Sequence, residues 1–330
     1  MTSTELPALL IYGATGYTGQ LIAEEASRAG LDFAVAGRDR TKVEKLANQL
    51  GVPGRTFALD DPSTVQKELQ DFQVVLNVAG PFSQTAERLI DAAIAAGVHY
   101  LDTTAEYAIF ALAEERSAAA AEAGVMLVPG VGWDVVPSDA VAVHAAGRTP
   151  RPVGLRVALK VTGGFSRGSV SSAAGIADLI GLVRSDGELV RRADAAPVGF
   201  DLGAGIEDYV PVPMGDLITA WHSVGLRDIE VFMRSEGAIP TPGEELPDGP
   251  TAAERNEGRY WALAEVTDAD GSVVRSVIET PTGYTYTQLS AVAAARNVLA
   301  GQHSAGFQTP SSAFGPDFAV SISDTHITDL

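Results

Sequence analysis

Cysteine is absent from the 330-residue chain, which also has only four lysines and five histidines. The absence of cysteine excludes disulfides, a thiolate nucleophile and cysteine metal sites. With so few and scattered histidines we expect no metal centre, which argues against a zinc-dependent dehydrogenase. No tyrosine stands four residues before any lysine. The Tyr-x-x-x-Lys pair of short-chain dehydrogenases is therefore missing.

Basic residues are also scarce, with 23 Lys and Arg against 42 Asp and Glu and a formal net charge of −19. Such a chain repels phosphate backbones, so we expect no nucleic-acid partner. Its first apolar run, residues 8–12, is far shorter than the roughly 18 residues that a membrane-spanning helix needs. No basic stretch precedes that run. We therefore expect a cytoplasmic protein without membrane insertion.

Short apolar runs alternate with helical patterns along the first 135 residues. Runs of this kind, uninterrupted by polar residues, are typical of parallel strands that are buried on both faces. Alternating strands and helices predict a doubly wound parallel sheet, the Rossmann architecture. Six strands are expected, at residues 9–12, 33–36, 56–59, 74–78, 99–101 and 125–128.

The rest of the chain has a different pattern. Two segments that favour strands, residues 260–266 and 273–278, flank Asp270-Gly271. An Asp-Gly pair between two such segments strongly indicates a hairpin. A helix is expected over 168–182 and a loop over 240–250. The pattern predicts an α+β domain with a mainly antiparallel sheet. We therefore divide the chain into a Rossmann domain (1–135), a domain for substrate binding or dimerisation (136–300) and a C-terminal segment that returns to the first domain (301–330).

The segment Gly13 to Gly19 reads G-A-T-G-Y-T-G and joins the first strand to a helix. In that context Gly13 makes a tight turn, Gly16 lets the backbone approach a pyrophosphate, and Gly19 lets helix and sheet pack closely. The pyrophosphate would lie on the N–H groups of the helix N-terminus. Further contacts are expected from three side chains of the loop: Thr15, Tyr17 and Thr18.

The end of the second strand distinguishes between the two nicotinamide cofactors. An acid at this position usually binds the ribose of NAD, but here Arg38 comes first and Asp39 stands between Arg38, Arg40 and Lys42. A guanidinium pairs well with a 2′-phosphate. We therefore expect NADP(H). The alternative is a solvated basic patch that precedes the next helix.

Residues at the ends of the later strands complete the expected cofactor site, because ligands of doubly wound sheets lie beyond the carboxyl ends of the strands. Asp60 and Asp61 are placed near the adenine, and Asp61 is equally suited to cap a helix that starts at Pro62. Small residues let the cofactor pass close to the fourth strand, and a threonine follows the fifth; these residues are Ala79, Gly80, Pro81 and Thr104.

Four motifs resemble the saccharopine dehydrogenase-like reductases: Y-G-A-T-G-Y-T-G (12–19), A-G-R-D (36–39), A-G-P-F (79–82) and V-G-W-D-V-V-P-S-D (131–139). The match is greatest to the branch that contains the trans-acting enoyl reductases and continues to residue 317. This resemblance implies an NADP-binding domain, a second domain with an extended sheet, and a C-terminal segment that returns to the first domain. Trp133 replaces an expected phenylalanine, at a position that would face the nicotinamide or the substrate.

Three residues are candidates for catalysis, each with a competing structural role. Asp134 could orient the nicotinamide or relay a proton, or it could cap a helix that starts near Pro137. Arg167 could bind a substrate carboxylate or phosphate, or form an interdomain ion pair. Tyr107 could donate a proton, as could Tyr284 and Tyr286, or each could be a packing aromatic.

The favoured function is reduction of a polarised double bond by NADPH. An activated C=C bond of a small or carrier-bound acyl metabolite is favoured, as in the enoyl reductases. Imine reduction of the saccharopine type is the alternative. A non-catalytic NADP-binding sensor or scaffold is a third reading, since fold does not determine function. A homodimer formed through the second sheet is also left open.

Overall fold

The computed structural model describes residues 8–170, 179–237 and 248–330. The chain forms two compact units, the first made of residues 1–104, 111–132 and 287–308 and the second of 105–110, 133–286 and 309–330. The helix and the loop expected over 168–182 and 240–250 fall largely outside the described residues. Within the part of the chain described, no helix is both long and apolar enough to cross a bilayer.

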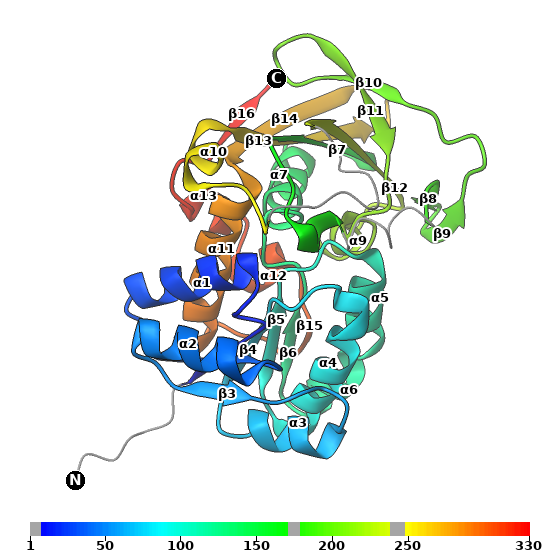
Figure 1. Ribbon diagram of the computed structural model, residues 1–330. Helices are drawn as coiled ribbons and strands as arrows, with labels where there is room; N and C mark the ends of the chain where they lie inside the picture. The colour runs from blue at the N-terminus through cyan, green and yellow to red at the C-terminus, as the bar shows by residue number, and fades with distance from the viewer. Residues whose placement is uncertain (1–7, 171–178, 238–247) are drawn as a thin grey trace. The chain divides into compact units, whose positions relative to one another are not determined.

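The first unit is built on a seven-stranded parallel sheet (Figure 1). Its strand order is β15-β6-β5-β4-β1-β2-β3, which places β1 between β4 and β2. This is the order of a Rossmann fold, in which the reversal of strand order beside β1 marks the ligand-binding crevice. The strands are β1 (Leu9–Tyr12), β2 (Phe33–Gly37), β3 (Gly54–Thr56), β4 (Val74–Asn77), β5 (His99–Asp102), β6 (Met126–Val128) and β15 (Gly306–Phe307).

The helices of this unit follow the expected alternation (Figure 1). Strands β1, β2 and β4 are completely buried, as expected from their apolar runs. The helix expected over 107–123 is two helices, with a break at Arg116. The helices are α1 (Tyr17–Arg28), α2 (Arg40–Leu50), α3 (Pro62–Leu69), η1 (Phe82–Gln84), α4 (Ala86–Ala96), α6 (Ser117–Glu122), and parts of α5 (Tyr107–Glu115) and α11 (Gly283–Leu299).

Two strands of the first sheet differ from expectation. The third strand is Gly54–Thr56 rather than 56–59, because it pairs with β2 from Val35 to Gly37. The second difference is β15, a two-residue strand that no local pattern indicates. It pairs with Met126 and Leu127 of β6 at the edge of the sheet. The expected segment 301–330 is accordingly divided, since its first residues add to the Rossmann sheet and residues from 309 onward belong to the second unit.

The second unit contains a nine-stranded mixed sheet, with β7 and β12 parallel to each other and the other neighbours antiparallel. The hairpin expected at Asp270-Gly271 joins β13 to β14. Strands of this unit are β7 (Pro152–Thr162), β8 (Leu182–Ser185), β9 (Glu188–Arg191), β10 (Val198–Asp201), β11 (Ile206–Pro211), β12 (Asp228–Glu236), β13 (Arg259–Asp268), β14 (Val273–Pro281) and β16 (His326–Asp329). Its helices are α7 (Val136–Gly147), α9 (Asp216–Val224), α10 (Ala252–Glu257), α12 (Pro310–Phe314) and α13 (Phe318–Ser321).

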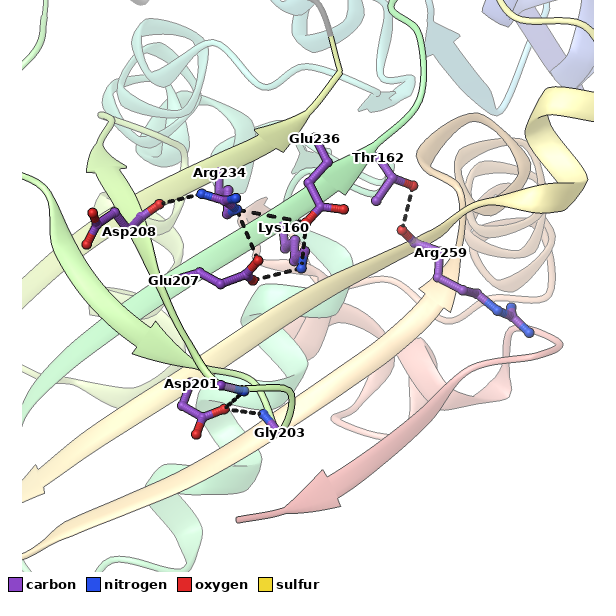
Figure 2. A network of polar contacts seen from close by, with 10 residues as sticks. Lys160, Thr162, Asp201, Gly203, Glu207, Asp208, Arg234, Glu236 and Arg259 are labelled. Carbon is purple, nitrogen blue, oxygen red and sulfur yellow. Dashed lines mark hydrogen bonds and ion pairs between the residues drawn. The ribbon is translucent and has the colours of Figure 1, made fainter.

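Helix α7 packs against β7, β13 and β14. A small aromatic cluster forms where the β10–β11 hairpin brings Phe200 and Tyr209 together with Phe232. Beside it, Lys160 pairs with Glu207 and Glu236 at 2.7 and 2.8 Å (Figure 2). The apolar cluster and the ion pairs together hold the hairpin on the sheet.

Candidate functional site

The glycine loop has the geometry that its sequence predicts. Gly13 has a φ of +89°, and a Cβ at this position would lie 2.6 Å from the backbone nitrogen of Ala79. A Cβ on Gly19 would lie 2.3 Å from the carbonyl oxygen of Gly13. Gly16 is exposed, and the nearest atom to its Cβ would be 3.5 Å away. Gly13 and Gly19 therefore allow close packing, whereas Gly16 leaves the backbone accessible to a ligand.

Helix α1 begins at the end of this loop without a side-chain cap. The next two helices begin differently, because Asp39 accepts from Lys42 N in α2 and Asp61 accepts from Ser63 N and Thr64 N in α3. A helix N-terminus beside a glycine loop is a favourable position for a phosphate. The expected pyrophosphate position is thus the one helix start among these three that no side chain caps.

The end of β2 presents the expected basic residues to solvent: Arg38, Arg40 and Lys42 are all exposed. The carboxylate of Asp39 accepts from the N–H of Lys42 at 3.1 Å. This cap commits one of its oxygens to the helix rather than to a ribose. The arrangement supports a 2′-phosphate beside Arg38 over a free ribose 2′-hydroxyl.

Tyr12, the last residue of β1, contacts Phe57 and is close enough to Arg38 to be affected by its charge. Burial raises the pKa of Tyr12 to about 12, with Arg38 lowering it and Asp60 raising it through their charges. Its ring packs against Phe57 at 5.1 Å. Asp60 is exposed and pairs with Arg88 at 3.3 Å. The charges of Arg38 and Asp60 thus both reach Tyr12.

The loop after β4 is held by Asn77, which the sequence analysis did not single out. The Asn77 side-chain oxygen accepts from Ala79 N at 3.0 Å, and its amide donates to the Tyr100 hydroxyl at 3.1 Å. Thr85 donates to the Ala79 carbonyl at 2.7 Å. Gly80 and Pro81, joined by a cis peptide bond, follow directly.

Asp102 is the second residue that the sequence analysis missed. Its carboxylate is completely buried and accepts from Tyr100 Oη at 2.8 Å, from Thr104 N at 2.9 Å and from Gly130 N at 2.8 Å. Its own carbonyl accepts from Val131 N at 2.7 Å. Three hydrogen-bonded residues, Asn77, Tyr100 and Asp102, therefore connect the loops after β4, β5 and β6. From the sequence, Asn77 and Tyr100 were expected within strands and Asp102 directly after one, with no local sign of their hydrogen-bond partners.

The second unit brings Trp133 and Asp134 close to Tyr260. The Trp133 indole donates to Thr280 Oγ1 at 2.8 Å and meets the Tyr260 ring edge-on at 4.7 Å. Burial raises the pKa of Asp134 to about 6. The charge of Asp134 in turn raises the pKa of Tyr260, after burial and Tyr284. The three side chains are thus near neighbours, and Asp134 is suited to hold a proton near neutral pH.

Tyr284, in the first turn of α11, is close enough to Tyr260 to raise the pKa of that residue. Its hydroxyl accepts from Ser166 N at 2.6 Å and lies 2.8 Å from Ser169 Oγ. The Ser169 and Ser166 hydroxyls are 3.1 Å apart. The result is a chain of hydroxyls that begins at a buried phenol and ends at the partly exposed Ser169.

The other catalytic candidates differ in their exposure and in the contacts that they make. Arg167 is 67% exposed and pairs with Asp248 at 2.9 Å, an ion pair within the second unit rather than between domains. Tyr107 begins α5 and is partly exposed. Tyr286 is fully buried and donates to the Ala319 carbonyl at 3.2 Å, as a packing aromatic does. Across the described residues, no group of His, Cys, Asp or Glu could hold a metal ion.

Comparison with known proteins identifies the first unit. Residues 9–128 match the family model of the saccharopine dehydrogenase NADP binding domain. These residues therefore form an NADP-binding domain of that family, and NADP(H) is the cofactor that the domain takes. The open Gly16, the uncapped α1 and the exposed Arg38 fit a bound nucleotide.

Relatives of the chain carry related names. A Mycobacterium tuberculosis protein with the provisional name trans-acting enoyl reductase is 34% identical over 179 residues, 50% of this chain and 42% of that protein. A saccharopine dehydrogenase-like oxidoreductase of Mus musculus is 30% identical over 151 residues, 40% of this chain and 35% of that protein. The matches thus span less than half of each relative.

The whole fold has a counterpart among solved structures. The apo saccharopine dehydrogenase (L-Glu forming) of Saccharomyces cerevisiae has a TM-score of 0.64 and 12% identity, covering 98% of this chain and 100% of that chain. At this identity the likeness shows the fold. It supports an α/β protein with a Rossmann sheet and a second, mixed sheet.

Proposed function

We propose that the protein is an NADPH-dependent oxidoreductase that reduces a polarised double bond of a small or carrier-bound metabolite. The observation that carries the proposal is the start of α2. There Asp39 serves as a helix cap while Arg38 remains exposed at the position where a 2′-phosphate would lie. The matching NADP-binding domain supports the cofactor.

When bound, NADPH supplies the hydride. The residues of this chain bind and orient it, with Arg38 and Lys42 at the 2′-phosphate and the loop from Gly13 to Gly19 at the pyrophosphate. Ala79, Gly80 and Pro81 line its path, and Thr104 follows the next strand. Asp60 and Trp133 retain their expected cofactor roles as part of this proposal.

After hydride addition the substrate needs a proton. Asp134 is the first candidate to supply it, because its pKa of about 6 keeps a protonated fraction near neutral pH. The Tyr284 hydroxyl is the second, since Ser169 connects it to the surface of the unit. Arg167 would bind an anionic group of the substrate, in exchange for Asp248. Tyr107 remains a proposed proton donor.

An activated C=C bond is the preferred substrate group. It is supported by the name of the M. tuberculosis relative and by the four motifs quoted above. Reduction of a C=N bond is the second candidate, supported by the name of the M. musculus relative. A homodimer and an acyl substrate are part of the proposal.

The first test is calorimetric titration with NADPH and NADH, with Arg38→Ala and the matched control Arg28→Ala. Arg28 lies at the opposite end of α1, so its loss changes the net charge equally but away from the glycine loop. We expect the wild-type protein to prefer NADPH, and Arg38→Ala to weaken NADPH at least tenfold, about 1.4 kcal/mol, without affecting NADH. Equal losses of NADPH affinity in the two variants would show that Arg38 acts only through the net charge of the protein.

The second test is NADPH oxidation with an enoyl thioester and, separately, with a 2-oxo acid plus an amine. Turnover of the thioester alone supports C=C reduction, whereas turnover of the oxo acid and amine supports imine reduction. Tight NADPH binding without oxidation by either substrate class would favour the sensor reading.

A further inference from the structure

We propose that Tyr100 and Asp102 are positioning residues for the nicotinamide half of the cofactor. The inference rests on the proposed function, because it assumes that NADPH binds at the carboxyl edge of the first sheet. The inference adds that different residues hold the two halves of the cofactor. Arg38 and the glycine loop hold the adenosine phosphates, while a buried hydrogen-bond chain shapes the loops around the nicotinamide.

The strand order assigns the two halves of the cofactor to the two sides of β1. The glycine loop follows β1, and Arg38 follows β2, its neighbour on one side. The neighbours on the other side are β4, β5 and β6. A dinucleotide lies across this reversal of strand order. With its 2′-phosphate beside Arg38, its nicotinamide end must extend toward the loops after β4, β5 and β6.

The conformation of all three loops depends on one buried chain of side chains. Asn77 binds Ala79 N after β4, and Asp102 binds Thr104 N after β5 and Gly130 N after β6. Tyr100 connects these two residues, accepting from the Asn77 amide and donating to Asp102 Oδ2. Through these two hydrogen bonds, the Tyr100 hydroxyl therefore connects the loop after β4 to the loops after β5 and β6.

The third loop is also the end of the first unit. Ser290 donates to the Val131 carbonyl at 2.7 Å, and a Cβ on Gly132 would lie 3.1 Å from the Thr287 side chain. Both contacts come from α11, so Asp102 and α11 hold residues 130–132 from two directions. The segment leads directly into Trp133, a proposed cofactor residue, and Asp134, the proposed proton donor.

Removing the Tyr100 hydroxyl would leave two buried polar groups without their shared partner. The Asn77 amide and Asp102 Oδ2 would lose it at positions with no exposed surface, where an unmade hydrogen bond is costly. The loops would then shift to find other partners.

The test compares two ligands by calorimetry, NADPH and adenosine 2′,5′-bisphosphate, which lacks the nicotinamide half. The variant is Tyr100→Phe, and the matched control is Tyr12→Phe, which removes a hydroxyl bonded to the Phe57 carbonyl at 3.3 Å on the adenosine side. We expect Tyr100→Phe to weaken NADPH about tenfold and leave the bisphosphate within twofold. Tyr12→Phe should change both ligands by the same factor.

A uniform loss, or none, for the two ligands in Tyr100→Phe would overturn the inference and leave the proposed cofactor intact. Failure of the wild-type protein to bind NADPH would refute the cofactor and, with it, the inference. If Tyr100→Phe does not fold, hydrogen exchange of the wild-type protein tests the inference instead. NADPH, but not the bisphosphate, should protect the amides of 103–104 and 129–132, and equal protection by both would refute the assignment.

Discussion

Gly16 and Gly19 stand three residues apart in one loop, yet their surroundings differ. The space around a Gly16 Cβ is open, whereas a Gly19 Cβ would overlap the Gly13 carbonyl oxygen and Ala14. Neither glycine has a positive φ, so backbone conformation does not explain their presence. Close packing explains Gly19, and the approach of a ligand explains Gly16.

This contrast predicts opposite outcomes for two alanine variants. Gly19→Ala should lower the free energy of unfolding by about 1–3 kcal/mol, as overpacking does, because the overlap is with backbone. Gly16→Ala should unfold within about 0.5 kcal/mol of the wild-type protein, yet weaken NADPH at least fivefold. Urea denaturation and calorimetry measure the two quantities. Undiminished NADPH binding by Gly16→Ala would contradict the assigned role of Gly16.

At the scale of elements, helix α9 carries an acid in an unusual environment. Asp216 is 1% exposed, and its carboxylate lies close to Ser138 and to the second acid Asp139. Burial raises the pKa of Asp216 to about 7, Ser138 lowers it, and the negative charge of Asp139 raises it further. Asp139, on α7, also has a raised pKa, mainly through burial. The first turn of a helix favours negative charge by only about 0.3–1 kcal/mol, so burial prevails.

The raised pKa predicts how stability changes with pH. Between about pH 4 and 7 the folded state holds a proton on Asp216 that the unfolded chain has released, so stability falls as pH rises through this window. In Asp216→Asn, the difference in unfolding free energy between pH 5 and pH 8 should shrink by about 2–3 kcal/mol.

Chemical denaturation at the two pH values measures this difference, with the exposed Asp208→Asn as control. Asp134 and Asp139 contribute in the same direction, so part of the pH dependence should persist in the variant. An unchanged difference in Asp216→Asn would show that Asp216 is ionised in the folded protein throughout this range.

At the scale of the whole molecule, the NADP-binding unit is discontinuous. In residues 1–132 alone, β6 would be the edge strand of the sheet. In the protein, Gly306 and Phe307 pair with β6. Residues 287–308 also contribute the bonds from Ser290 to Val131 and from Arg296 to the Ala29 carbonyl at 3.1 Å. A contiguous N-terminal domain is therefore incomplete.

We expect a fragment of residues 1–132 to be less stable than the same fragment joined to 287–308 by a short glycine–serine linker. The linker can be short because Gly132 lies beside Thr287. The added segment should raise the free energy of unfolding by at least about 2 kcal/mol, given several hydrogen bonds of about 1 kcal/mol each. Urea denaturation of both fragments measures this, and equal midpoints would contradict it.

Local features of the sequence predicted much of the fold. The apolar runs that form β1, β2 and β4, the glycine turn at Gly13 and the hairpin at Asp270-Gly271 lie where expected. Each depends on the few residues around it, through burial on both strand faces or through a required backbone angle. The exposed Arg38 is of the same kind, since the end of a strand can be recognised from its neighbours.

Other features required the tertiary structure. The sequence pattern placed Tyr100 within a strand and Asp102 directly after it. Their hydrogen-bond partners lie in β4 and after β6, the two strands that pair with β5. β15 has two residues and forms only because the edge of β6 is available. Trp133 meets Thr280 across 147 positions of sequence. Local patterns specify which residues are buried and where a strand ends, whereas the partner of a buried polar group depends on which distant segments the sheet order brings together.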